Sequence, residues 1–127
     1  MTKLTNILGV LIVFSINTPI FAADESAGEL AYAQCIGCHS FGYNRTGPDH
    51  CGLNGRLAGT VSGYGYSVSM RESGIVWSQQ TLDEFLSSPL SFIPATTMGF
   101  AGINDSTQRK ILVEYIIEQS SSLECKQ

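Results

Sequence analysis

The residues best suited to chemistry are two cysteines and a histidine, within the run Cys35-Ile36-Gly37-Cys38-His39. This C-x-x-C-H spacing is typical of a covalent attachment site for a c-type haem. On one helical turn the two thiols can each form a thioether with a vinyl group of the porphyrin, and the imidazole that follows can bind the iron. The motif therefore predicts one haem c, attached through Cys35 and Cys38, with His39 as an axial ligand.

Two other uses of these cysteines are weaker. A zinc site would need His50 and Cys51 as its second ligand pair, and these two residues are adjacent rather than spaced as in zinc motifs. A thioredoxin-like dithiol would need a βαβ pattern around the motif, and the sequence shows none.

Helices are expected to position these residues. Three segments of the sequence have a helical pattern. Residues 24–36 form the first, with acidic residues in its first turn. Ser78 can cap a second, short helix that Pro89 ends. Asn104 or Asp105 caps the third, in which Ile111, Leu112, Tyr115, Ile116 and Gln119 recur on one face.

A long stretch between the first two helices, residues 42–65, is rich in Gly, Pro and Asn and reads as a structured loop. A loop of this length needs contacts with something inside it, and a haem would supply them. The sequence therefore predicts an all-α fold, with three main helices and long loops wrapped around one covalent haem.

The N-terminal residues 1–22 have the features of a secretory signal peptide. Lys3 supplies the positive region, residues 7–16 are apolar, and Pro19 precedes a cleavage site after Ala22, with cleavage after Ala23 as the alternative. The apolar run is short for a bilayer span, so export to the periplasm is favoured over a retained anchor and no stable membrane insertion is expected. Residues 23–127 then suit one small domain.

The net charge of that domain limits the kinds of partner it can bind. Seven basic and eleven acidic residues give the chain a net charge of −4, and loss of Lys3 would leave about −5. Because no basic patch exists, nucleic acid is not an expected partner.

A sixth iron ligand could be a methionine, because Met/His ligation is typical of electron-transfer cytochromes. Residues 23–127 contain two, Met70 and Met98. Met98 lies in a proline-bounded loop far from His39, and Met70 lies in a polar stretch. By spacing alone Met98 could be a ligand or a packing residue, and the choice stays open.

Four separated motifs then follow one another in the order of a known family. They are Cys35-Ile36-Gly37-Cys38-His39; Thr46-Gly47-Pro48 with Gly52-Leu53-Asn54-Gly55-Arg56; Gly63-Tyr64-Gly65-Tyr66-Ser67 with Gly74-Ile75-Val76-Trp77; and Ile93-Pro94-Ala95-Thr96-Thr97-Met98 with Phe100-Ala101-Gly102-Ile103. On these motifs residues 28–120 resemble class I cytochromes c, the mitochondrial-type proteins and their short bacterial periplasmic relatives.

The resemblance implies a role for each matched residue. His39 and Met98 would be the axial ligands, and the Pro48 carbonyl would accept the ring N–H of His39. Arg56, Tyr66 and Trp77 match positions that hydrogen-bond one haem propionate, and Thr96 the other. Gly28 and Tyr32 match the place where the first helix crosses the last, against Leu112 and Tyr115.

The function implied by the resemblance is one-electron transfer, not catalysis. The expected protein is a monomeric diffusible carrier between redox partner proteins, and the alternative is a dedicated cytochrome subunit of a periplasmic dehydrogenase. The family often has a tyrosine at the position of Phe85, an asparagine at that of Met70 and a lysine at that of Thr97. The first two differences have opposing effects on the reduction potential, and the scarcity of lysines argues against docking to a strongly acidic partner.

Two cysteines, Cys51 and Cys125, have no role in haem attachment. In an oxidising periplasm two such thiols more often pair than stay free. The fold implied by the resemblance makes their regions neighbours, so a Cys51–Cys125 disulfide is expected, with two free thiols as the alternative.

Overall fold

The regular elements of the described part of the chain are all helices. The structure, a computed structural model, describes residues 22–126, so the expected signal peptide lies outside the described residues except for Ala22. Within this range the elements are α1 (Ala22–Tyr32), α2 (Val68–Glu72), α3 (Gln79–Ser87), α4 (Pro89–Phe92), α5 (Ser106–Gln119) and the 3-10 helix η1 (Leu123–Lys126). Between residues 22 and 126 the only β pairing is an isolated bridge between Leu57 and Val76. The prediction of an all-α fold is confirmed, with α1, α3 and α5 as the main helices.

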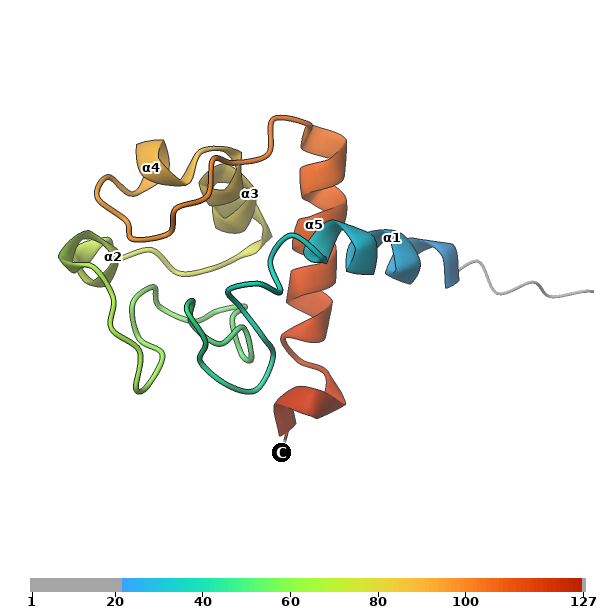
Figure 1. The fold of residues 1–127 in the computed structure, drawn as a ribbon, viewed down its shortest axis with the longest axis horizontal. Coiled ribbons are helices and arrows are strands. Elements are labelled where there is room, and N and C mark those ends of the chain that lie inside the picture. The colour runs from blue at the N-terminus through green and yellow to red at the C-terminus, as the bar shows by residue number, and fades with distance from the viewer. Residues whose placement is uncertain (1–21, 127) are drawn as a thin grey trace, which may run out of the picture.

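Helix α5 is the axis of the fold. In Figure 1 it is crossed by α1, and α3 lies on its other side. A Cβ atom on Gly28 would lie only 2.6 Å from the Cβ of Tyr115, so a side chain at this position would separate the two helices. The Tyr32 and Tyr115 rings meet at the same crossing, with centroids 5.6 Å apart. The expected crossing at Gly28 is therefore confirmed.

Local capping explains where two of the main helices begin. Asp105, of the two candidates, caps α5, because its side chain accepts from the backbone N–H groups of Thr107 and Gln108 at 2.8 and 3.1 Å. Ser78 caps α3 in a reciprocal capping box with Thr81. Both N-caps satisfy backbone donors that the first helical turn would otherwise leave unpaired.

One expected helix end is wrong, and another is confirmed. Helix α1 ends at Tyr32 rather than at residue 36, and a chain of turns follows it, in which Cys35 N–H donates to the Tyr32 carbonyl at 2.7 Å. Pro89 ends α3 as expected, since this helix stops at Ser87 with Ser88 as its C-cap, and Pro89 also begins α4, where its missing N–H and fixed φ suit the first helical turn. The short α2, α4 and η1 carry too few residues to give a periodic pattern, and the sequence did not predict them.

The loop over residues 42–65 is irregular, as expected, and is tied to the rest of the fold. Gly55 N–H donates to the Trp77 carbonyl at 2.8 Å, and Trp77 N–H donates back to the Arg56 carbonyl at 2.9 Å. Four residues before Gly55, Cys51 is joined to Cys125 by a disulfide, with Cα atoms 5.2 Å apart. This is the pairing that the sequence predicts, and it links the loop to η1.

Candidate functional site

A cavity of about 310 Å³ lies between the turn after α1, the long loop, α3 and the loop that precedes α5. Its size falls within the range of about 300–1,000 Å³ that is usual for small-molecule sites. All nine residues that the sequence assigned to a cofactor line it: Cys35, Cys38, His39, Pro48, Arg56, Tyr66, Trp77, Thr96 and Met98. The fold thus brings the four separated motifs to one place.

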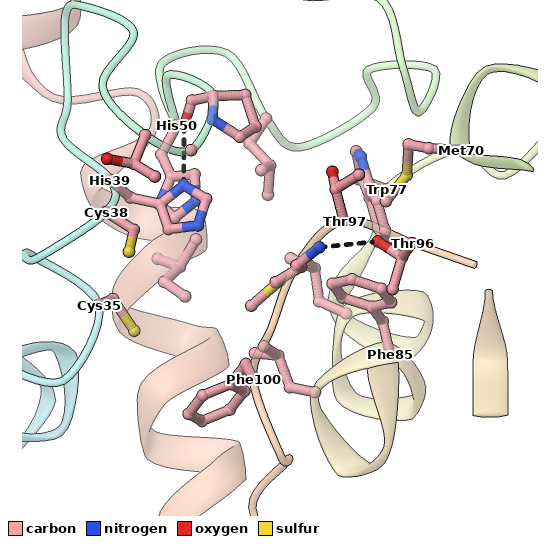
Figure 2. Close-up of a pocket in the computed structure, with 18 of the residues that line it drawn as sticks. Cys35, Cys38, His39, His50, Met70, Trp77, Phe85, Thr96, Thr97 and Phe100 are labelled. Atoms are coloured by element: carbon pink, nitrogen blue, oxygen red, sulfur yellow. Dashed lines mark hydrogen bonds between the residues drawn. The ribbon is translucent and has the colours of Figure 1, made fainter. Parts of the chain in front are cut away.

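His39 forms one wall of this cavity together with the two thiols (Figure 2). Its side chain is 8% exposed, and its Nδ1 lies 2.8 Å from the Pro48 carbonyl oxygen. Because a carbonyl only accepts, Nδ1 carries the proton and Nε2 keeps its lone pair for a metal. Burial lowers the pKa of His39, against the opposing effect of the Pro48 hydrogen bond, which keeps the ring neutral and suited to ligation.

The two thiols of the motif are unpaired and differ in exposure. Hydrogen bonds from the N–H groups of Cys38 and His39 to the Cys35 carbonyl, at 3.0 and 2.9 Å, close one helical turn around the motif. Cys35 is half-buried and Cys38 is exposed. Burial raises the pKa of the Cys35 thiol to about 11, and the nearby Cys38 thiol acts in the same direction.

The opposite wall carries the side chains expected near a methionine ligand. In Figure 2, Met70, Trp77, Phe85, Thr96 and Thr97 lie across the cavity from His39. The Trp77 and Phe85 rings are buried and lie 5.2 Å apart. Phe85 and Met70 thus make this wall apolar where the family pattern has polar groups.

Met98 and Met70 both line the cavity, on different elements. Met98 is half-buried in the loop before α5, and its backbone N–H donates to the Thr96 side-chain oxygen at 3.3 Å. Met70 is 8% exposed within α2 and belongs to the buried core. A core position suits packing, whereas a loop side chain can turn toward a cofactor.

Arg56 has a second role that the sequence did not predict. Its guanidinium donates to the backbone carbonyls of Cys51 and Asp49, and the Asp49 bond is 2.9 Å long. Burial lowers its pKa, but an arginine stays charged in proteins. Arg56 therefore holds the long loop in shape, and its remaining N–H groups are available to an acidic group in the cavity.

Two further residues of the His39 wall were missed. A Cβ atom on Gly47 would lie 2.4 Å from His39 Cε1, so only glycine lets the backbone approach the ring this closely. The His50 ring stacks on that of His39, with centroids 4.2 Å apart and an angle of 22° between the planes. Gly47 lies in one of the four motifs and could have been singled out, whereas no sequence pattern places His50 against His39.

The zinc alternative is wrong. Cys51 is held in the disulfide, and His50 stacks on His39 with its Nδ1 beside the Tyr32 hydroxyl. Among residues 22–126 no group of three or more His, Cys, Asp or Glu side chains could hold a metal ion. The donor set of two thiols and one imidazole, above an apolar cavity, fits a covalently attached haem.

Comparison with known proteins gives the same answer. No family profile matches the chain. It is 36% identical over 113 residues to cytochrome c2 from Blastochloris viridis, covering 87% of this chain and 89% of that protein. It is 41% identical over 106 residues to cytochrome c 2.1 from Caenorhabditis elegans, covering 80% of this chain and 96% of the relative.

A solved structure agrees in both fold and sequence. Cytochrome cH from Methylobacterium extorquens superposes with a TM-score of 0.72 at 36% identity, covering 75% of this chain and 98% of that one. The chain belongs to the class I cytochrome c family. Cytochromes c of this family carry one c-type haem attached through two cysteines, and Cys35 and Cys38 form the single C-x-x-C-H motif of this chain. The protein therefore binds one covalent haem c and transfers electrons, and it is not an enzyme.

Proposed function

We propose that this cytochrome c is a periplasmic one-electron carrier whose haem iron is bound by His39 and Met98. The observation that carries the proposal is the cavity itself, which both residues line together with Cys35 and Cys38. The iron supplies a single-electron redox couple when the haem is bound. The protein residues orient the ligands, exclude water and set the relative stability of the two oxidation states.

Each side of the cavity contributes to this task. The hydrogen bond from His39 to the Pro48 carbonyl fixes the ring and increases its donation to iron. A thioether ligand from Met98 raises the reduction potential. The buried Trp77 and Phe85 rings keep water from the sulfur side.

The propionates of the haem would meet four polar side chains. Arg56, Tyr66 and Trp77 line one part of the cavity and offer a guanidinium, a phenol and an indole N–H, while Thr96 offers a hydroxyl. Burial raises the pKa of Tyr66, so its phenol stays protonated and able to donate. Charge-assisted hydrogen bonds of this kind offset the desolvation of a carboxylate.

Export to the periplasm is supported by the expected signal peptide of residues 1–22 and by the Cys51–Cys125 disulfide, which persists in oxidising compartments. Residues 23–127 would then be the single mature domain. Among the described residues no helix is long and apolar enough to cross a membrane.

A redox titration of the purified holo-protein, followed by visible and near-infrared absorption, tests the ligand set. The oxidised protein should show the weak near-infrared sulfur-to-iron band, and Met98→Ala should abolish it and lower the potential. Axial ligation is among the factors that set haem potentials over a range of roughly 0.8 V, so a large drop is expected. Met70→Ala is the matched control and should keep the band; the reverse result would make Met70 the ligand.

The expected partners are redox proteins that do not rely on strong charge attraction. With a charge near −5 and Thr97 in place of a lysine beside the ligand, electron transfer to the native acceptor should depend weakly on salt, or accelerate with salt if the acceptor is acidic. Stopped-flow measurement over a range of ionic strength checks this. A steep fall in rate with rising salt would contradict it.

A further inference from the structure

His50 is a buried polar side chain to which none of the roles above gives a purpose. Its side chain is only 8% exposed. Its ring stacks on that of His39, and its Nδ1 lies 3.1 Å from the hydroxyl oxygen of Tyr32. Tyr32 is itself buried and belongs to α1. A continuous set of contacts thus runs from α1 through His50 to His39.

The surroundings leave the His50 ring little freedom. Two aromatic rings pack against it in edge-to-face arrangements. The angle between ring planes is 63° for Tyr32 and 67° for Phe41, and their centroids lie 5.9 and 5.8 Å from that of His50. A hydrocarbon side chain could fill such a place without any polar partner. A buried imidazole needs one, because an unpaired polar group in an apolar interior is destabilising, and the Tyr32 hydroxyl provides it.

The His50 ring is neutral in this position. Burial lowers its pKa well below the usual value, and the neighbouring His39 and Arg56 act in the same direction.

We propose that His50, held in place by the Tyr32 hydroxyl, is a positioning residue for the His39 imidazole. The inference rests on the proposed role of His39 as an axial ligand. The Pro48 carbonyl restrains His39 at Nδ1, but one hydrogen bond leaves the ring plane free to tilt about it. Stacking with His50 restrains the plane itself.

Two consequences can be measured separately. The plane of the axial imidazole relative to the haem contributes to the anisotropy of the ferric electron paramagnetic resonance (EPR) signal, so a tilt of the ring changes the g values. The polarity of the ring beside the ligand affects the reduction potential, because a polar neighbour stabilises the additional positive charge of ferric iron better than a hydrocarbon does.

The test compares two substitutions in the oxidised holo-protein. His50→Leu removes both the stacked ring and its polarity, so it should change the EPR g values and raise the potential. His50→Phe keeps an aromatic ring but loses its polarity and its bond to Tyr32, so it should raise the potential and shift the g values less than His50→Leu does. Tyr32→Phe removes only the hydroxyl and should shift the g values in the same direction as His50→Leu, by less.

A core substitution away from the cavity is the control. Val113 is 1% exposed on α5 and is not among the residues that line the haem cavity. Val113→Ala should lower stability but leave g values and potential unchanged. An equal spectroscopic change in Val113→Ala and His50→Leu would overturn the positioning role.

The outcomes separate this inference from the proposed function. A parent spectrum without histidine–methionine ligation would overturn the proposed function and this inference with it. If the parent and His50→Leu both show the near-infrared band, and His50→Leu has the g values and potential of the parent, only the role of His50 is overturned. If His50→Leu yields no holo-protein, the Tyr32→Phe variant tests the positioning role instead. Tyr32→Phe g values identical to those of the parent would overturn the role of His50.

Discussion

The two walls of the haem cavity are braced differently. On the His39 wall the imidazole meets the Pro48 carbonyl at 2.8 Å, the stacked ring of His50 and the backbone of Gly47. On the opposite wall, the loop that carries Met98 has a weak hydrogen bond of 3.3 Å from Met98 to Thr96. The same loop contains Ala95 with φ of 62°, the only positive φ outside glycine in residues 22–126.

This difference separates two ways of holding a ligand. The protein orients His39 through its own packing, so His39 is held in place whether or not a metal is bound. Met98 itself has only the hydrogen bond to Thr96, and its loop contains a strained residue, so the closed form of the loop should depend more on the proposed iron–sulfur bond. Changes to the His39 wall should therefore alter stability with the ligand set intact, whereas changes to the Met98 loop should alter ligand exchange.

The largest effect should come from the disulfide on the His39 wall. Cys51 and Cys125 are 74 positions apart, and a cross-link over such a loop stabilises by about 4 kcal/mol in the chain-entropy model. The haem thioethers already restrain the unfolded chain, so this figure is an upper value. Replacing both cysteines with serine should lower the free energy of unfolding in guanidinium by up to this amount.

The near-infrared band should survive in this double variant, because the disulfide lies behind the His39 wall and not in the Met98 loop. Parent protein reduced and alkylated at the same two thiols is the matched control and should lose similar stability. Loss of the band before global unfolding would show that the two walls are not independent.

A smaller effect is expected at Gly47. The Cβ of an alanine there would lie 2.4–2.7 Å from three atoms of the His39 ring, and overpacking of this kind costs about 1–3 kcal/mol. Gly65→Ala is the matched control, since its Cβ would meet nothing within 4 Å and its φ is not positive. Guanidinium unfolding of the two holo-proteins measures the difference. Equal stabilities would mean that the His39 ring moves aside without penalty.

The features that the sequence could predict are those set by motifs and by local signals. The cavity residues could be assigned because each motif fixes residue type and spacing, and the capping box of α3 could be assigned because it is local. Gly28 was also predictable, since it matches the crossing of α1 with α5 in the family.

The features that the sequence did not predict are those that tertiary packing determines. Helical periodicity continues past Tyr32, but the chain leaves α1 there to bring the thiols of Cys35 and Cys38 to the cavity. Pro89 ends α3 as expected, but the sequence did not show that it also begins another helix. The stack of His50 on His39 depends on how the long loop returns to the motif, and no local pattern encodes that return.

The smallest effect, and the sharpest test of the Met98 loop, is expected from Ala95→Gly. An L-residue in the left-handed region is strained by about 1–2 kcal/mol, while glycine adopts it freely. Part of this gain is offset by the greater entropy of glycine in the unfolded chain, so a net stabilisation of roughly 0.5–1 kcal/mol is expected. Guanidinium unfolding of the holo-protein measures it.

Ligand exchange should change as well, because exogenous imidazole can bind the iron only after the Met98 loop opens. In the parent, opening releases the strain at Ala95, whereas the variant has no strain to release. Imidazole should therefore bind the ferric variant about 2–5-fold more weakly, which is the affinity equivalent of the same 0.5–1 kcal/mol. Ala101→Gly is the control in the same connection: Ala101 is exposed and has no positive φ, so glycine there should only loosen the loop and leave imidazole affinity equal or higher. Weaker binding in both variants would mean that strain at Ala95 does not contribute to opening, and that the loop is held by the iron–sulfur bond alone.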